Sequence, residues 1–489
     1  RRSYFDAIIP FVVPDDIGGE LTVAPRYWDY QGRVNVMLGG GHELEAFAYG
    51  SDDVLEFIFS SPQANNPFLR GSAAASTSFH RGQLTWNYRS DTFRNRLVYN
   101  FGSTVLDFGV GDSLRFLLDI LQHTVREEAR FELDDRLAVV MGMDMVFGTA
   151  EVTARLPRQR QDGEFAGGFD TLEYLELGVE QGYYQPAAFM EVELDVLEEL
   201  LLVLGGRFDY ARELGSFTGD LRSSLRWTID KNFSVTGGVG RFSQAPEFQA
   251  TAEDFGNPDL DWQHAVHYAL GGSARAPFYE PLTLEITGFY KSLNDLVAPS
   301  TDTVIRNGRI EPERFANTGE GRVYGAELLL RHELANNFFG WIAYTVSRAE
   351  RNDQPGEEME LFEFDQTHIL TALASYKLPA QWQIGLRFRY VTGRPFTPQE
   401  GAVFDADADA YQPLFGVPGS QRVEAFHQLD LRVDKSWVFD WWILSAYLDI
   451  QGVYFHANPE FIQYNFDSTQ QGYVRGLPIL PSIGIKGEF

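Results

Sequence analysis

The stretch NTGEGRVYGAELLL, residues 317–330, contains the residue pattern from which the fold of this chain can be predicted. From Tyr324 to Leu330 every second side chain is apolar, and the positions between carry glycine or charge, except Leu329. A period of two is that of a half-buried β-strand, because successive side chains point to opposite faces. The first half, with Gly321 ahead of Gly325, resembles a loop, and glycines at a strand start relieve crowding where backbones approach closely. The stretch therefore predicts a loop that runs into a strand with one apolar face.

The same alternation recurs along the chain. The clearest segments are LTLEITGFYKSL from residue 282, QIGLRFRY from 383, QLDLRVDKSW from 428 and LSAYLDIQGVY from 444. A soluble sheet with one solvated face would also alternate. However, the polar face of these segments carries Asp, Arg, Glu and Lys, which is typical of a water-filled bore. Tryptophan and tyrosine cluster near the segment ends, as in the aromatic girdles of membrane proteins, at Trp341, Trp437, Trp441, Trp442 and Tyr447.

Composition supports an all-β membrane protein. The 489 residues are 14% aromatic and include 46 glycines and no cysteine, and 69 acidic against 40 basic residues give a net charge of −29. So negative a chain would repel the phosphates of nucleic acid, which excludes nucleic acid as a partner. No stretch approaches the roughly 18 to 20 apolar residues of a membrane-spanning helix, since LEELLLVLGG at 197–206 is short and charged. If the chain crosses a membrane, it crosses with strands.

The connections between the strands differ in length. Short joints are expected at LANN (334–337), KLPAQ (377–381) and FDW (439–441), and long polar insertions at 350–365 and 393–425. Short periplasmic turns and long extracellular loops are typical of outer-membrane barrels. We therefore predict a transmembrane antiparallel β-barrel of about 20 to 22 strands, with residues 1–489 forming a single domain.

Five segments occur in this order along the second half of the chain: GRFSQAPEF at 240–248, GNPDLDWQHAVHYALG at 256–271, FYKSLNDLV at 289–297, FANTGEGRVYGAEL at 315–328 and DQTHIL at 365–370. These segments resemble the C-terminal barrel of TonB-dependent outer-membrane receptors. In the second segment Trp262 and Gln263 stand where the family has proline and glutamate. Their shared order over residues 235–489 carries the resemblance, whereas the first half is similar to the family only in texture. The last strand ends on Phe489 and resembles the signal read by the barrel-assembly machinery.

The resemblance implies an outer-membrane transport protein that takes up a scarce nutrient such as a siderophore, cobalamin or carbohydrate. It implies energy from a TonB-type inner-membrane complex that acts through an N-terminal plug, and no catalysed reaction. Nothing here matches the plug or its TonB box, and RRSYFDAI at 1–8 resembles an early barrel segment, so we expect the chain to lack the plug. Outer-membrane lipid, lipopolysaccharide and other envelope proteins are the further partners expected.

Two other functions remain open. A passive porin, or a structural barrel subunit of a larger outer-membrane complex, would fit the apparent lack of a plug. A soluble acidic β-rich enzyme would share the composition, but no serine-centred elbow or cysteine nucleophile is present and no catalytic residue is expected.

Candidate binding residues lie in the long loops. On loop position alone we predict ligand contact at Arg394, Phe396, Asp405, Asp407 and Tyr411. The segment FDADADAYQP at 404–413 also sets Asp405, Asp407 and Asp409 on alternate positions, like half of a calcium loop, but it lacks that loop's glycine and closing glutamate. A solvated acidic loop is favoured, with a surface Ca²⁺ site as the alternative and no other cofactor expected.

His264 and His267 are three residues apart, which suits a metal site on a helix. In a strand an odd spacing places the two rings on opposite faces. We expect a strand here and no metal site.

Overall fold

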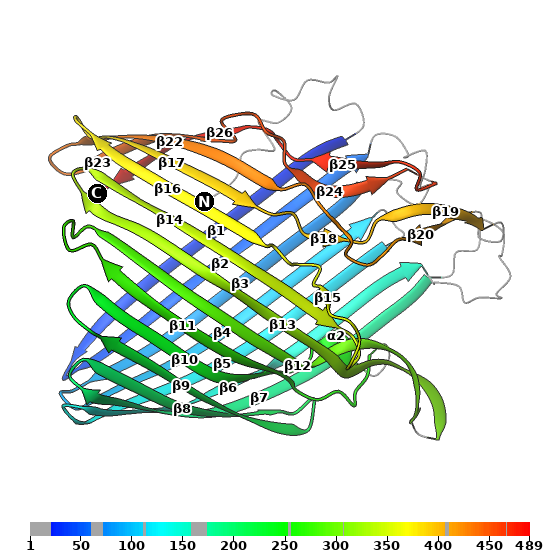
Figure 1. Ribbon diagram of the computed structural model, residues 1–489, viewed down its shortest axis with the longest axis horizontal. Helices are drawn as coiled ribbons and strands as arrows, with labels where there is room; N and C mark the ends of the chain where they lie inside the picture. The colour runs from blue at the N-terminus through cyan, green and yellow to red at the C-terminus, as the bar shows by residue number, and fades with distance from the viewer. Residues whose placement is uncertain are drawn as a thin grey trace. The chain divides into compact units, whose positions relative to one another are not determined.

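The computed structural model describes residues 21–59, 72–110, 114–157, 174–252, 256–306, 308–405, 410–465 and 467–489, so RRSYFDAI lies outside the described residues. Within these ranges twenty strands join one antiparallel sheet, in agreement with the predicted 20 to 22 (Figure 1). The single helix in these ranges is α2 (Phe248–Thr251). None of the described residues form a helix long and apolar enough to cross a bilayer.

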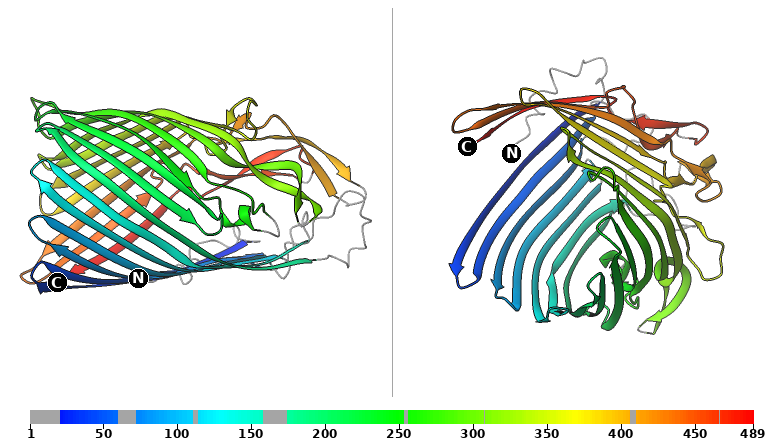
Figure 2. Two further views of the ribbon diagram at one scale, coloured as in Figure 1. Left: turned by 90° about the horizontal axis from the view of Figure 1, so that it is seen from below. Right: turned by 60° about the vertical axis from the view of Figure 1, so that its left-hand side comes forward.

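The chain divides into two compact units, residues 1–193 with 205–219, and residues 194–204 with 220–489. The prediction of a single domain stays a prediction. The first unit contains β1 (Leu21–Gly39), β2 (His42–Phe59), β3 (Ser72–Arg89), β4 (Phe93–Val110), β5 (Leu114–Asp134), β6 (Leu137–Pro157) and most of β7 (Tyr174–Leu197). Strands β1 to β6 lie side by side, each pairing with the next along almost its whole length (Figure 2). Each has 18 residues or more, whereas about 10 suffice to cross a bilayer.

One face of the first unit is apolar and exposed. The cross-strand register sets Val36 beside Leu44, Leu44 beside Trp86 and Trp86 beside Leu97, which makes an apolar row over four strands. Val36 and Leu44 are both exposed. A continuous exposed apolar surface of this kind is typical of a lipid-facing wall.

The second unit contains the remaining strands. Strands β8 (Leu200–Ala211) and β9 (Ser216–Thr228) have residues in both units. The strands that lie wholly in the second unit are β10 (Phe233–Gln244), β11 (Gln263–Arg275), β12 (Leu282–Arg306), β13 (Arg309–Ala335), β14 (Phe338–Asn352), β15 (Glu360–Leu361), β16 (His368–Leu378), β17 (Trp382–Val391), β18 (Pro395–Phe396), β19 (Gln399–Asp405), β20 (Ala410–Phe415), β21 (Gln421–Arg422), β22 (Phe426–Val438), β23 (Ile443–Gln451), β24 (Pro459–Tyr464), β25 (Gln471–Arg475) and β26 (Leu480–Glu488). The strands predicted from residues 282, 383, 428 and 444 are β12, β17, β22 and β23.

Residues 317–330 all lie within β13, so the prediction of a loop over the first half was wrong. The strand continues because β12 extends alongside it, with register shifts between Leu293 and Leu296 and between Leu296 and Ala298. The glycines serve close approach inside the strand. A β-carbon at Gly325 would lie 2.3 Å from the carbonyl oxygen of Val346 on β14, too close for any other residue.

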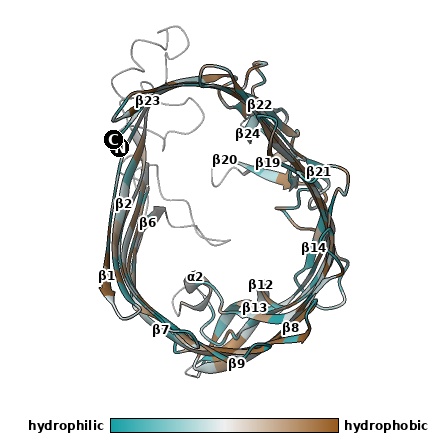
Figure 3. Cartoon of the chain, turned by 90° about the vertical axis from the view of Figure 1, so that its left-hand side faces the viewer, coloured by the Kyte–Doolittle hydropathy of each residue, from teal (hydrophilic) through white to brown (hydrophobic). Residues whose placement is uncertain are grey.

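The predicted alternation is confirmed in the second unit. Ile286 pairs with Leu328, and Tyr290 with Tyr324, on one face. Ile286 is 48% exposed although it lies in the middle of a sheet. Its neighbour Glu285 lies on the opposite, polar face. Figure 3 shows hydrophilic and hydrophobic residues alternating along the strands.

The predicted short joints are confirmed as turns at one end of the second unit. The turn between β13 and β14 holds Asn336 at φ 51° and Asn337 at φ 65°, and the next turn holds Ala380 and Gln381 at φ 59° and 62°. Two successive positive φ angles are those of the tight turn that suits the twist of a hairpin. At the other end, residues 353–367 and 392–425 form long connections that contain β15 and β18 to β21.

The last strand is also confirmed. β26 pairs antiparallel with β23, and Ile483 and Ile485 are exposed on its apolar face. The ring of Phe489 stacks on Trp442, with 5.9 Å between ring centroids. The chain end is therefore part of an aromatic cluster at the short-turn end of this unit.

Candidate functional site: a charged wall and interlocked loops

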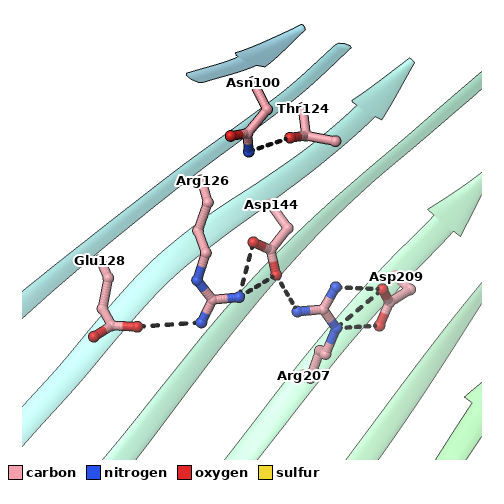
Figure 4. A network of polar contacts seen from close by, with 7 residues as sticks. All are labelled: Asn100, Thr124, Arg126, Glu128, Asp144, Arg207 and Asp209. Carbon is pink, nitrogen blue, oxygen red and sulfur yellow. Dashed lines mark hydrogen bonds and ion pairs between the residues drawn. The ribbon is translucent and has the colours of Figure 1, made fainter. Parts of the chain in front are cut away.

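A charged network lies on the polar face of the first unit (Figure 4). Arg126 on β5 donates to both carboxylate oxygens of Asp144 on β6, at 3.0 Å each. Arg207 on β8 donates to Asp144 as well and forms a forked contact with Asp209 at 2.9 to 3.0 Å. Asp144 thus accepts from two guanidiniums on different strands, and its side chain is 17% exposed.

Local packing holds this network in place. The Arg126 guanidinium lies 4.9 Å from the centroid of the Phe189 ring on β7, a cation–π contact. Phe189 in turn approaches the bare backbone at Gly142, where an added β-carbon would lie 2.7 Å from the ring. Alternating fixed charges on a half-exposed wall can hydrogen-bond water and polar groups. Every named carboxylate here is paired with a cation, which is unlike the arrangement of a general base.

The long connections of the second unit are joined by a buried ion pair. The Asp365 side chain, 1% exposed, accepts from Arg422 Nη2, from the Ala349 amide at 2.8 Å and from Thr367 Oγ1 at 3.0 Å. Arg422 Nη1 donates to the carbonyl of Gly393 at 2.9 Å. The pair therefore fixes residues 353–367 against residues 392–425.

A third connection, residues 452–479, is attached to the same loops. Arg475 on β25 donates to Glu424 at 2.8 Å. Ser468 Oγ donates to the Gln399 side chain at 2.7 Å, and the Gln399 amide donates to Tyr464 Oη at 3.1 Å. Three loops that are distant in sequence thus form one hydrogen-bonded body.

The GNPDLDW segment is a further structural element at this end. Asn257 donates to the Phe315 carbonyl on β13 at 2.6 Å and accepts from the Asp259 amide at 2.9 Å. Arg306 on β12 donates to Asp259 at 3.1 Å. Trp262, which replaces the expected proline, is buried. The segment therefore anchors the connection between β10 and β11 to the extended β12–β13 hairpin.

The predicted ligand-contact residues lie in different parts of these loops. Arg394 is exposed, and its carbonyl accepts from the Val423 amide at 3.0 Å, while Phe396 lies on β18 opposite Gln421. Tyr411 lies on β20, where its ring meets that of Phe404 edge-on with 5.2 Å between centroids.

The acidic residues of the same loop are only partly described. Asp405 ends β19, and Asp407 and Asp409 lie outside the described residues. In the described ranges no group of three or more His, Asp or Glu side chains is placed to hold a metal ion. The ligand contacts and the alternative Ca²⁺ site stay predictions.

Sequence reasoning missed the Asp365–Arg422 pair. Asp365 was part of the DQTHIL motif, but nothing around Arg422 indicated its partner 57 residues away. His264 and His267 lie on β11, on opposite faces as expected for a strand. His264 Nδ1 is 3.1 Å from Ser243 Oγ, whereas the His267 ring packs against Phe242 with 4.6 Å between centroids.

Comparison with known proteins decides the family. The family model described as TonB dependent receptor-like, beta-barrel, matches residues 15–451. The chain belongs to the TonB-dependent receptor barrel family. The match includes the first half of the chain, where residue patterns alone showed only a general similarity to the family. Its fold is thus the transmembrane antiparallel β-barrel of this family, with short periplasmic turns and long extracellular loops, and it resides in the outer membrane.

Several solved receptors and transporters share this fold. The ferripyoverdine receptor of Pseudomonas aeruginosa is 12% identical with a TM-score of 0.65, covering 95% of this chain and 65% of its own. The siderophore receptor PirA from Acinetobacter baumannii is 15% identical with a TM-score of 0.66, covering 95% and 71%. The ferric citrate transporter FecA is 13% identical with a TM-score of 0.66, covering 95% and 70%.

A curated relative of this TonB-dependent receptor barrel is the iron-regulated outer membrane virulence protein of Vibrio cholerae serotype O1. It is 23% identical over 237 residues, which cover 45% of this chain and 36% of the relative. The aligned region thus spans about a third of the length of the curated relatives that the chain matches.

Proposed function

We propose that this protein is an outer-membrane uptake receptor for an iron chelate of the siderophore type. The observation that carries the proposal is the family match over residues 15–451. It is supported by what the relatives are named for, since the curated relative is iron-regulated and several solved neighbours are receptors or transporters of ferric siderophores or ferric citrate.

In this proposal the interlocked extracellular loops present the ligand-binding surface. Exposed aromatic side chains on the β19–β20 hairpin, among them Phe404, Tyr411 and Phe415, offer a surface for the organic part of a chelate. Arg394, Phe396, Asp405 and Asp407 complete the contacts that we propose. Hydrogen bonds between the loops lower the entropic cost of binding, because the loops are ordered beforehand. The protein binds and releases its ligand without catalysing a reaction.

Energy for entry comes from a TonB-type inner-membrane complex, as in the family to which the barrel belongs. The test is uptake of radiolabelled ferric siderophore by cells that express the complete protein as their single siderophore receptor. Uptake should occur and should cease when the TonB protein is removed. Uptake that persists without TonB, or none from a panel of catecholate, hydroxamate and citrate chelates, would overturn the proposal.

Bilayer conductance distinguishes the passive porin. The complete protein, purified and inserted into a planar bilayer, should conduct almost no current if it is a gated receptor. Steady ion currents would favour the porin function instead.

A further inference from the structure

Two arginines and a buried glutamate form a compact group on the outward face of the second unit. Arg322 on β13 and Arg348 on β14 are 44% and 52% exposed, whereas the Glu350 side chain between them is 4% exposed. The next side chains on this face of β13 are Tyr324, Ala326 and Leu328, so the group lies where the apolar surface ends.

Register places the group at the extracellular border of the lipid-facing surface. Arg322 precedes Tyr324 by two residues on the same face of β13, which places it one step nearer the extracellular end of the strand, and it pairs directly with Glu350. Arg348 pairs with Tyr324, whose own row contains Tyr290. Rows of tyrosine on the outside of a barrel mark the interface between hydrocarbon and head groups. The two guanidiniums therefore lie at the level of the outer-leaflet head groups.

The carboxylate aligns the two guanidiniums. Arg322 Nε donates to Glu350 Oε2 at 2.6 Å, and Arg348 Nε donates to Glu350 Oε1 at 2.5 Å. Each arginine thus hydrogen-bonds the carboxylate through Nε, which leaves its Nη groups out of this contact. In the part of the chain that the structure describes, no side chain or carbonyl accepts a hydrogen bond from those Nη groups.

Charge and geometry select the ligand. Within the group of Arg322, Glu350 and Arg348, two guanidiniums against one carboxylate leave one net positive charge, and the next charge on this face of β13 is the carboxylate of Glu320. Forked guanidinium donors match the paired oxygens of a phosphate or a carboxylate. At the level of the outer-leaflet head groups, phosphate is the anion that the lipid presents. Ser292, which pairs with Arg322 on β12, adds a hydroxyl beside the site, and Glu320 is one step farther from the membrane.

We infer that Arg322 and Arg348, aligned by Glu350, bind a phosphate group of lipopolysaccharide, the anionic lipid of the outer leaflet. The inference depends on the outer-membrane location and not on iron uptake. Glu350 is a positioning residue, and the arginines make the contact.

The test measures binding of bis-phosphorylated lipid A to the complete, delipidated protein in detergent, by native mass spectrometry with EDTA present to exclude divalent bridging. The double variant Arg322→Gln with Arg348→Gln should bind about thirtyfold more weakly, since each arginine at an anionic surface contributes to lipid affinity. Lipid A without phosphates should bind the parent and the double variant equally. Arg331→Gln, on the opposite face of β13, is the matched control and should stay within twofold of the parent.

The variant Glu350→Gln distinguishes alignment of the two arginines from simple electrostatic attraction. It removes a negative charge, so simple electrostatic attraction would tighten lipid A binding, whereas loss of alignment should weaken it at least threefold. Tighter binding would overturn the inference, as would a double variant within threefold of the parent. Displacement of lipid A by an equal concentration of inorganic phosphate would overturn the lipid assignment in favour of free phosphate.

Folding is checked for every variant by the shift in electrophoretic mobility on heating. Arg348→Gln alone serves if the double variant does not fold. Ferric siderophore uptake is measured in the same variants. If uptake fails in the parent while lipid A binding behaves as expected, the proposed function is wrong and the lipid site stands.

Discussion

Arginine–aspartate ion pairs occur both in the charged network of the first unit and between the long connections of the second, but the two sets differ in how deeply the carboxylate is buried. Asp144 is 17% exposed and lies between two arginines on an open strand face. Asp365 is 1% exposed and accepts three hydrogen bonds around a single arginine. The pairs around Asp144 are partly open to solvent, while the buried pair fixes the positions of loops. Burial, not the kind of residue, decides whether an ion pair determines structure here.

The largest effect should come from Arg422→Met. Removing the cation leaves Asp365 buried and unpaired, which typically costs about 3 to 5 kcal/mol. Residues 353–367 and 392–425 should become sensitive to limited proteolysis, while the barrel keeps its heat-dependent electrophoretic mobility. Loops that stay as resistant as in the parent would show that burial of Asp365 does not order them.

Gly325→Ala should have the next largest effect, because its β-carbon would meet the Val346 carbonyl at 2.3 Å. The backbone must shift, at a cost of about 1 to 3 kcal/mol. The control is Gly288→Ala on the neighbouring strand, where the nearest atom to an added β-carbon is 3.9 Å away. Guanidinium unfolding in detergent measures both, and equal free energies of unfolding would refute the close-approach explanation.

Single substitutions in the network of Arg126, Asp144 and Arg207 should change the free energy of unfolding only slightly. Arg126→Gln and Arg207→Gln should each cost about 1 kcal/mol or less, since Asp144 keeps one guanidinium in either variant. The double variant should cost more than the sum of the two, because Asp144 then loses both cations. A double-mutant cycle of unfolding free energies checks this. Simple additivity would mean that Asp144 does not couple the two strands.

The smallest effect should come from Arg475→Gln. Both side chains of the Arg475–Glu424 pair are more than 40% exposed. Exposed pairs contribute about 0 to 1 kcal/mol, and less at high salt. Proteolysis of residues 452–479 should be almost unchanged. If this variant opened the loops as widely as Arg422→Met, the contrast between exposed and buried pairs would fail.

Residue patterns predicted the strands because alternation is local. The polar Glu285 and the apolar Ile286 are neighbours in the sequence, which indicates opposite faces of a strand. The pair Asn336 and Asn337 indicates a tight turn. Residues 317–321 were mistaken for a loop because their conformation depends on β12 alongside and on the Gly325 contact with β14. The Asp365–Arg422 pair was beyond prediction because its partners are far apart in sequence and meet only when two loops fold together. The same holds for Glu350, whose role depends on the register between β13 and β14.

The lipid-facing role of the apolar strand face can be measured directly with spin labels. Since the chain has no cysteine, single cysteines at Glu285 and Ile286 can each carry one spin label in the complete protein, reconstituted in lipid bilayers. Oxygen dissolved in the bilayer should relax the label at 286, and a water-soluble nickel complex should relax the label at 285. If both labels respond to the nickel complex alone, or if the two responses are exchanged, the apolar face does not meet lipid and the strands do not form a membrane-spanning wall.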